Sequence, residues 1–415
     1  MNYYIIGILG SGTSALASLL IQMKNNVKGT DVCQAIKNYD GPLEVDDIRF
    51  VHPQTNYIYI YGNAFKNHPL TKIVSNLGYN VMSYSQMLEH LSFDKRIQIS
   101  ASHGKTFTTA LLSHMLNSSR LIGDGTAKYL GDEEFVYEGC EYQNTFLTYH
   151  PDFLVILNID YDHVDFFKTK QDYFNAFVNA SRNAKFLIID SNIKIQHNNK
   201  YTFSLDDSCA DLFGNLVYSN DLYSIIDIKF KGKSYRIKSP FITKYENNNL
   251  LACILTSLLL GRDIDSIENK LLSFKRPKRR MDIRNINGYT LILDYAHHPT
   301  QIIALYEYIN SKFKGKRKLI VYEGHTLSRS LFFLKEYKEA LSRFDEVMLY
   351  PIFYARENKS KREKEYYTYL KYPKYNVKKK LKKYDKNEFV FIFAGAGIID
   401  LEYENVCCYV KNEAL

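Results

Sequence analysis

Apolar residues recur along this chain with the two periods that distinguish strands from helices. Residues 3–9 form an apolar run, residues 7–14 a glycine-rich turn, and residues 16–23 continue with helical spacing. The same order returns later, where residues 96–100 alternate polar and apolar and residues 107–116 place their apolar side chains on one helical face. Alternating short strands and helices predict an α/β fold.

Further apolar runs end in polar residues that can do chemistry. Ligands gather at the carboxyl ends of the strands of a parallel sheet, so we expect binding residues at these ends. The runs are 135–137 before Glu138 and Glu141, 153–157 before residues 158–165, 289–293 before Asp294, and 318–322 before residues 323–329.

Length and composition are those of a globular protein with several domains. The 415 residues suffice for two or three domains, and the hydrophobic content of 46% is ordinary. We place the boundaries at residues 1–94, 95–284 and 285–415. The N-terminal segment lacks the charged leader of a signal peptide. The longest apolar run, residues 250–260, is too short to span a bilayer. The six cysteines have neither metal-ligand spacing nor the spacing of a disulfide framework. We therefore expect a cytoplasmic protein without membrane contact.

The net charge of +9 raises the question of a polyanionic partner. Residues 356–386 are crowded with Lys and Tyr, and basic residues interleaved with aromatics can bind nucleic acid. The chain is rich in Lys, Asn and Tyr throughout, so we interpret this segment as a solvated helical face. We expect no nucleic-acid partner.

The turn Ile99-Ser-Ala-Ser-His-Gly-Lys-Thr106 is the strongest candidate for a phosphate site. Backbone N–H groups at a helix start bind anions, Lys105 would reach the terminal phosphates, and the Thr106 hydroxyl would ligate Mg²⁺. A purely structural turn is the alternative, because the positions at which P-loops carry their first glycine hold Ile99 and Ala101. If position 101 needed a glycine-only conformation, alanine would cost about 1 kcal/mol there, and Ala101→Gly would strengthen ATP use.

A second glycine-rich turn, near the start, permits two interpretations. Gly10, Gly12 and Ala15 satisfy the dinucleotide fingerprint, and Asp31 follows at the distance of a ribose-binding acid. This makes an NAD-dependent oxidoreductase an alternative. The fingerprint itself indicates only a pyrophosphate over a helix start, and any nucleoside diphosphate supplies one.

The polar strand ends also permit a structural interpretation. Carboxylates suit Mg²⁺ and a neutral imidazole can complete a site, but such loops are often only solvated or capping. Pro299 suits the first turn of a helix, so His297 and His298 could merely flank a helix start.

In their order and spacing, these motifs resemble the Mur ligase family almost from end to end. The matching segments are Gly-Ser-Gly at 10–12, Gly-Thr-Asp at 29–31, Gly-Asn-Ala at 62–64, His-Gly-Lys-Thr at 103–106, Gly-Asp-Gly-Thr at 123–126, Glu-x-Cys-Glu-Tyr near 138–142, Asn-Ile-Asp-Tyr-Asp-His-x-Asp at 158–165, Arg-Arg at 279–280, Asp-Tyr-Ala-His-His-Pro at 294–299, His-x-x-x-Arg at 325–329 and Gly-Ala-Gly at 395–397.

The resemblance implies a Rossmann-like N-terminal domain, a central P-loop mononucleotide-binding domain and a C-terminal Rossmann-like α/β domain. It implies an ATP- and Mg²⁺-dependent ligase of peptidoglycan precursor synthesis, which joins L-alanine to the lactyl carboxylate of UDP-N-acetylmuramate through an acyl phosphate. The expected partners are these small molecules alone, with the protein a monomer or homodimer.

The resemblance also assigns residues to each ligand. Catalysis would fall to Lys105, Glu138, His163 and Arg280, and Thr106, Glu138 and His163 would hold the cations. The ATP-binding residues would be Ser102, His103, Gly104, Lys105, Thr106, Thr108, Asn249, Arg280 and Asp294. The UDP-sugar would bind Gly10, Ser11, Gly12, Thr13, Asp31 and Asn63. The substrate and amino acid would meet Glu141, Tyr142, Tyr295, His297, His298, His325 and Arg329, with Arg329 pairing with a carboxylate.

Several positions depart from the family pattern beside these sites. They are Ala101 for the P-loop glycine, Tyr245 for a histidine, Leu293 for an acid, Glu323 and Gly324 for Gln-Pro, and Ile398 for an aspartate. Two further possibilities follow, namely a ligase of altered acceptor or UDP-sugar specificity and a catalytically silent Mur-like binding protein.

Overall fold

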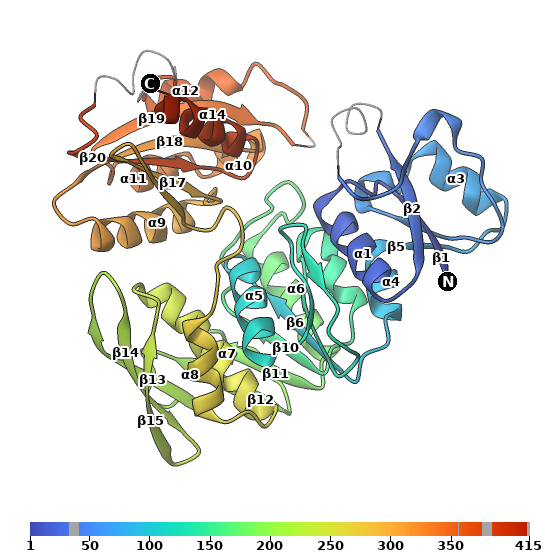
Figure 1. Ribbon diagram of the computed structural model, residues 1–415, viewed down its shortest axis with the longest axis horizontal. Helices are drawn as coiled ribbons and strands as arrows, with labels where there is room; N and C mark the ends of the chain where they lie inside the picture. The colour runs from blue at the N-terminus through green and yellow to red at the C-terminus, as the bar shows by residue number, and fades with distance from the viewer. Residues whose placement is uncertain (33–40, 356, 376–383, 413–415) are drawn as a thin grey trace.

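Three β-sheets follow one another along the chain, each with its own helices (Figure 1). The computed structural model describes residues 1–32, 41–355, 357–375 and 384–412. The strands predicted from the apolar runs are all present, with ends shifted by up to three residues. The predicted α/β class with three domains is therefore confirmed.

The first sheet is parallel, with strand order β3-β2-β1-β4-β5. Alternate residues of β1 face opposite sides, so Tyr3 and Ile5 pack with α1 and α4, while Tyr4 and Ile6 pack with α3. The elements are β1 (Asn2–Ile6), α1 (Ser11–Gln22), β2 (Asn26–Asp31), β3 (Val45–Asp47), η1 (Ile48–Phe50), β4 (Ile58–Tyr61), η2 (Asn63–Phe65), α3 (Pro69–Asn76), β5 (Val81–Ser83) and α4 (Tyr84–His90).

The central sheet has the order β15-β14-β13-β12-β11-β10-β6-β9-β7-β8, and β6 lies inside its parallel part. Its elements are β6 (Lys95–Ser100), α5 (Lys105–Leu116), β7 (Ser119–Leu121), β8 (Ala127–Lys128), β9 (Glu134–Glu138), η3 (Tyr142–Thr148), β10 (Phe153–Ile156), α6 (Lys170–Arg182), β11 (Phe186–Asp190), β12 (Lys200–Ser204), β13 (Leu212–Ser219), β14 (Ser224–Phe230), β15 (Lys233–Ser239), α7 (Lys244–Leu259) and α8 (Ile264–Leu272).

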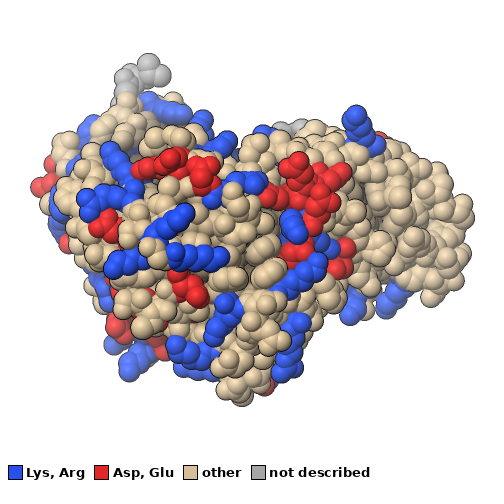
Figure 2. All heavy atoms as spheres, turned by 90° about the horizontal axis from the view of Figure 1, so that it is seen from below, with Lys and Arg blue, Asp and Glu red and all other residues tan. Residues whose placement is uncertain are grey.

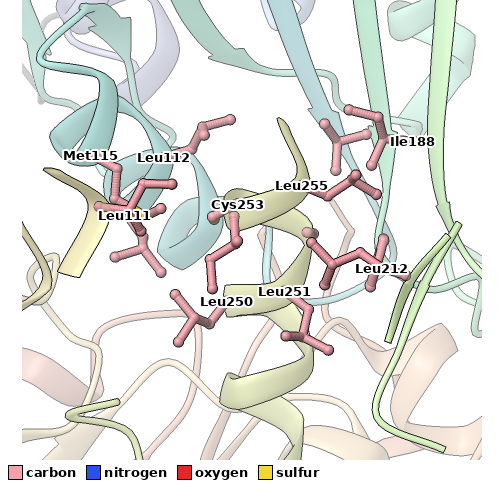
Figure 3. Close-up of a cluster of buried hydrophobic side chains, with 14 of the residues drawn as sticks. Leu111, Leu112, Met115, Ile188, Leu212, Leu250, Leu251, Cys253 and Leu255 are labelled. Atoms are coloured by element: carbon pink, nitrogen blue, oxygen red, sulfur yellow. The ribbon is translucent and has the colours of Figure 1, made fainter. Parts of the chain in front are cut away.

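Helices α5 and α7 form the main core of this domain. Leu111, Leu112 and Met115 of α5 face Leu250 and other apolar side chains of α7, over the central strands (Figure 3). The apolar run at residues 250–260 is thus a helix buried against protein on several sides. Among the helices of the described residues, none combines the length and apolar character needed to cross a membrane.

The third sheet has the order β16-β17-β20-β18-β19, parallel except for the hairpin of β16 and β17. Helices α9, α11 and α12 pack on one face and α14 on the other. The elements are β16 (Asp282–Ile286), β17 (Tyr289–Asp294), α9 (Pro299–Lys312), β18 (Arg317–His325), α10 (Leu327–Phe332), α11 (Leu334–Leu341), β19 (Glu346–Phe353), α12 (Glu363–Leu370), β20 (Phe389–Ala394) and α14 (Ile399–Asn412).

Charged side chains of both signs are interspersed on the face of the molecule shown in Figure 2. The Lys-rich run at residues 378–383 lies outside the described residues.

Candidate functional site

The carboxyl ends of three neighbouring strands meet at one edge of the central sheet, because β6 lies between β10 and β9. The turn at residues 101–104 follows β6, Glu138 ends β9, and β10 leads into the loop at residues 158–165. Asn158 connects two of these segments: its Oδ1 accepts from the backbone N–H of His103 at 3.0 Å, and its Nδ2 donates to the carbonyl of His103 at 2.9 Å. The acidic loops predicted at strand ends therefore surround the glycine-lysine-threonine turn.

The turn has the geometry of an anion cradle. Gly104 has a φ of +89°, and a Cβ there would lie 2.7 Å from the Tyr245 hydroxyl, so only glycine fits. Helix α5 begins at Lys105 without a side-chain cap, which leaves first-turn N–H groups open to a ligand. A phosphate group fits this helix start.

Lys105 points back across the turn. Its Nζ donates to the carbonyl of Ala101 and lies 2.8 Å from Oε2 of Glu141, a side chain that is 1% exposed. Burial acts to lower the pKa of Lys105, but Glu141 outweighs burial and the pKa is raised. Burial acts to raise the pKa of Glu141, but Lys105 and His163 lower it below its ordinary value. The ammonium group is therefore held charged beside the phosphate cradle.

Thr106 and Glu138 lie close to each other and to Lys105. Glu138 Oε1 accepts from the backbone N–H of Gly123 at 2.6 Å, and Arg280 Nη2 lies 3.5 Å from Thr106 Oγ1. Burial raises the pKa of Glu138, against the opposing effects of Gly123, Lys105 and Thr106. A carboxylate whose charged form is disfavoured by its surroundings gains from a cation, and Glu138 is only half-buried, so these residues fit Mg²⁺ bound with phosphate oxygens.

In the part of the chain that the structure describes, no group of three His, Cys, Asp or Glu side chains could hold a metal ion. His163 contacts a different carboxylate from Glu138: its Nε2 lies 3.1 Å from Glu141 Oε1. A Mg²⁺ ion here would depend on the nucleotide for most of its ligands, as is usual for this ion.

A pocket of about 700 Å³ adjoins the turn, between the central and C-terminal domains. Four of the predicted ATP residues line it: His103, Gly104, Arg280 and Asp294. Tyr245 also lines the pocket, and its hydroxyl lies near Gly104. Asn249 of α7, which is 2% exposed, also lies near Gly104. Phe107 and Tyr308 add aromatic surface suited to a base.

The remaining predicted ATP residues are buried behind the turn. Thr108 is fully buried in α5, and its hydroxyl has no hydrogen-bond partner among the described residues. Ser102 Oγ bonds to the carbonyl of Asp160 at 2.6 Å and lies 2.7 Å from the Tyr173 hydroxyl. Ser102 thus helps to hold the loop at residues 158–165 against the turn.

The predicted UDP-sugar residues gather at the start of α1, whose N-cap Gly10 offers no side-chain cap. Asp31 accepts from the backbone N–H groups of Leu9 and Val32, both at 2.8 Å, and Thr13 Oγ1 donates to the carbonyls of Gly7 and Gly10. These two side chains therefore shape the turn itself. The others take their places around it: Ser11 and Gly12 in the first turn of α1, and Asn63 in η2, bonded to Thr145 of the central domain at 3.2 Å.

Ser11 also lines a second, larger cavity, of about 710 Å³. Thr106 and Gly123 line it from the central domain, and Arg280 and Tyr295 from the C-terminal side. The start of α1 and the phosphate turn therefore open into one cavity, which is lined by residues of all three domains.

The predicted amino-acid residues lie mostly where the C-terminal domain meets the central one. Tyr295 lies between the guanidinium groups of Arg279 and Arg280, at 4.9 and 4.8 Å from its ring centre. Arg329 forms a buried ion pair with Asp162, and its Nη1 lies 3.2 Å from His325 Nδ1. Tyr142 lies beside the His163 ring and donates its hydroxyl to Asp165.

His298 is buried at this boundary, and His297 is half-buried beside it. The Nδ1 of His298 accepts from Thr300 N at the start of α9, as the helix-start interpretation predicts. Its ring also lies 4.6 Å from that of His103, whose nitrogens make no hydrogen bond to the described residues. Burial lowers the pKa of all three imidazoles, so they are neutral in this interface.

The condition of a glycine-only conformation at position 101 is not met. Ala101 is not among the residues with a left-handed backbone, and its methyl group is fully buried in the core beside Ile99 and Phe107. Alanine is therefore accommodated without strain, and the premise for strengthening ATP use by Ala101→Gly is lost.

The structure also shows what surrounds the other residues that differ from the family pattern. Glu323, 1% exposed, accepts from the backbone N–H groups of Gly397 and Ile398 at the start of α14, where a carboxylate is favoured. Leu293 is buried in the third domain's core. Gly324 has the Ser330 hydroxyl 3.1 Å from where its Cβ would be, and Ile398 is 45% exposed.

Residues that pattern reasoning did not assign include Asp162, Arg276 and Arg279. Asp162 lies within a motif that was recognised, but its partner is 167 residues away. Arg276, in the segment joining the domains, pairs with Glu246 and lies over the ring of Tyr308. No periodicity identifies such a residue.

A P-loop domain between two further α/β domains, with carboxylates and arginines converging on the phosphate turn, defines the class of ATP-dependent amide ligases. The Mur ligase middle domain matches residues 132–257, and the Mur ligase, glutamate ligase domain matches residues 279–386. The chain belongs to the Mur ligase family through these middle and C-terminal domains.

Solved structures share the whole fold. A UDP-N-acetylmuramate-alanine ligase from Thermotoga maritima has a TM-score of 0.78 at 21% identity, with 100% of both chains covered. A murein peptide ligase from Psychrobacter arcticus gives 0.72 at 18%, covering 99% of each chain. A pseudomurein peptide ligase type C from Methanothermus fervidus gives 0.66 at 18%, covering 98% of this chain and 99% of that one. At these identities the likeness concerns the fold alone.

Proposed function

We propose that this protein joins the amine of L-alanine to the lactyl carboxylate of UDP-N-acetylmuramate, with ATP as the phosphoryl donor. The observation that carries the proposal is the cavity shared by Ser11, Thr106 and Arg280. A nucleoside diphosphate over the start of α1 would extend its sugar through this cavity toward the γ-phosphate on the P-loop.

The chemistry requires an activated carboxylate, because a carboxylate is a poor electrophile. A carboxylate oxygen forms a bond to the γ-phosphorus as the bond between that phosphorus and the β,γ-bridging oxygen breaks, which yields an acyl phosphate and ADP. Lys105 and Arg280 would neutralise charge on the transferred group. Thr106 and Glu138 would hold Mg²⁺, which would supply further neutralisation of the phosphate charge.

Amide formation follows at the acyl carbon. The amine nitrogen adds to it, the carbon–oxygen bond to phosphate breaks, and the nitrogen loses a proton as phosphate leaves. The basic and imidazole groups where the C-terminal domain meets the site would orient the acceptor; among them, Tyr295, His297, His298 and His325 are our candidates. Arg329, paired with Asp162 in this structure, would bind the acceptor's carboxylate only by leaving that pair after phosphoryl transfer.

A different acceptor or UDP-sugar is the alternative within the same chemistry. Two proteins of similar fold are named as peptide ligases. The family also favours an amide ligase over the NAD-dependent oxidoreductase that the first turn alone permits.

One assay distinguishes these possibilities. The protein is incubated with ATP, Mg²⁺ and UDP-N-acetylmuramate, together with L-alanine, glycine, L-serine or the peptide L-alanyl-γ-D-glutamyl-meso-diaminopimelate, and both phosphate release and product mass are followed. We expect release that depends on sugar and amino acid, with L-alanine the best acceptor. A better rate with the peptide assigns the altered specificity, and no turnover with any acceptor supports the silent binding protein. Nicotinamide-dependent absorbance change without ATP would restore the oxidoreductase.

A further inference from the structure

A buried ion pair joins the C-terminal domain to the loop of the central domain that carries His163. Arg329 Nε on α10 lies 2.8 Å from Asp162 Oδ1, and Nη2 lies 3.2 Å from Oδ2. The two side chains are only 5% and 3% exposed. The guanidinium group outweighs burial and holds the pKa of Asp162 well below its usual value. Removing either partner would leave the other charge buried and uncompensated.

The C-terminal domain contacts this loop beyond the ion pair. Tyr161 lies edge-on to Phe332, with ring centres 5.6 Å apart, and packs with Val164 against the core of the C-terminal domain. The loop at residues 158–165 follows strand β10 of the central sheet, and its side chains Tyr161 and Val164 pack against the C-terminal domain.

From Asp162 a continuous series of contacts leads to the phosphate turn. Asp162 Oδ1 also accepts from the backbone N–H of His163 at 2.6 Å. The φ of His163 is +52°, a region that residues other than glycine seldom adopt, so this hydrogen bond helps to hold the backbone there. His163 Nε2 lies 3.1 Å from Glu141 Oε1, and Glu141 Oε2 lies 2.8 Å from Lys105 Nζ.

We propose that Asp162 is a positioning residue for the reaction: docked on Arg329, it fixes His163 and, through Glu141, the ammonium group of Lys105. The assignment rests on the proposed function. Its physical basis is that Arg329 is the one member of the series that belongs to the C-terminal domain. Docking of that domain then completes the site for phosphoryl transfer, while binding of the UDP group at the start of α1 does not depend on it.

The test is Asp162→Asn, which keeps the shape of the side chain and removes its charge. We expect kcat for phosphate release to fall at least about tenfold, with the Kd for UDP-N-acetylmuramate changed less than about threefold. Arg329→Gln should do the same, and the double variant should be no slower than the slower single one, since both changes break one contact. Arg329→Lys, which keeps the charge, should retain more activity than Arg329→Gln.

The matched control is Asp227→Asn, which breaks an ion pair with Arg236 of similar length, 2.6 Å, but with side chains 37% and 67% exposed. It should change neither kcat nor Kd. An Asp162→Asn enzyme with unchanged kcat would overturn the proposal. So would a parallel loss of kcat, UDP-N-acetylmuramate affinity and thermal stability, because that is the signature of a purely structural pair.

Small-angle X-ray scattering of the ligand-free protein separates this proposal from the proposed function. We expect Asp162→Asn to have a larger radius of gyration than the wild type, as the C-terminal domain leaves the loop. If the wild type turns over no acceptor, the proposed function fails, and an enlarged variant still supports docking through Asp162. An unchanged radius of gyration would refute the docking contact whatever the assay shows.

Discussion

Replacing Ala101 by glycine is the most informative single change at the phosphate turn, since it restores a residue that P-loops often carry there. The Ala101 side chain is 0% exposed, packs in a core that includes Ile99 and Phe107, and does not have a left-handed backbone. Glycine therefore gains no conformation that the site needs. We expect Ala101→Gly to destabilise the central domain and to weaken ATP use.

The magnitude has two parts. Loss of a buried methyl group costs about 0.8 kcal/mol, and the extra freedom of glycine in the unfolded chain adds roughly 0.5–1 kcal/mol. The sum, about 1.5 kcal/mol, lowers Tm by about 3–6 °C for a cooperative unit of 150–250 residues. The Ala101 carbonyl also accepts from Lys105 Nζ, so a looser turn holds the lysine less well. We therefore expect the KM for ATP to rise by a few fold.

Differential scanning calorimetry and ATP-dependent phosphate release measure both effects. Ala355→Gly is the matched control, because Ala355 is exposed and has a φ of +51°, where glycine is favoured. It should leave Tm unchanged or raise it slightly. A lower KM for ATP in Ala101→Gly, without loss of Tm, would show that position 101 does need a glycine conformation and that our reasoning is wrong.

Three further outcomes are expected around the site. Lys105→Ala should lower ligase activity at least about 1000-fold while leaving UDP-sugar affinity, measured by titration calorimetry, within a few fold; loss of both would mean that the ligands are assigned to the wrong domains. Gly104→Ala should raise the KM for ATP at least about tenfold, since φ is +89° and a Cβ would lie 2.7 Å from the Tyr245 hydroxyl; an unchanged KM would contradict the cradle. Burial lowers the pKa of His103 and His298 below 6.5, so the stability that depends on their neutral forms is complete above pH 6.5 and is lost as the pH falls below it. Tm measured from pH 8 to pH 5 should fall, and His298→Asn, which retains a helix cap, should make that fall shallower; identical slopes would exclude His298 as a source.

The sequence predicts local features of the site well. The strand, turn and helix around Lys105 depend on residues adjacent in the chain, namely an alternating run, a glycine at a left-handed position and an apolar helical face. The helix start at Pro299 is likewise local, and so is the role of His298 as its cap. The shared order of such local motifs is also what indicates the family.

The partners of the charged residues are less predictable. Nothing beside Lys105 in the sequence indicates that Glu141 holds its ammonium group, and Glu323 reaches the start of a helix about 75 residues away. The interpretation of Ala101 depended on its φ, which sequence patterns do not report. These facts depend on which segments the folded chain brings together.

The sequence by itself determined the three α/β blocks, the phosphate turn and the residue types available for amide ligation, because hydrophobic periodicity and turn chemistry act over a few residues. Only the tertiary structure decided which charges meet. It pairs Arg329 with Asp162, turns Lys105 toward Glu141 and opens the start of α1 into the cavity beside Thr106. The physical reason is that strand order and domain docking, and not separation along the chain, set the distances over which buried charges interact.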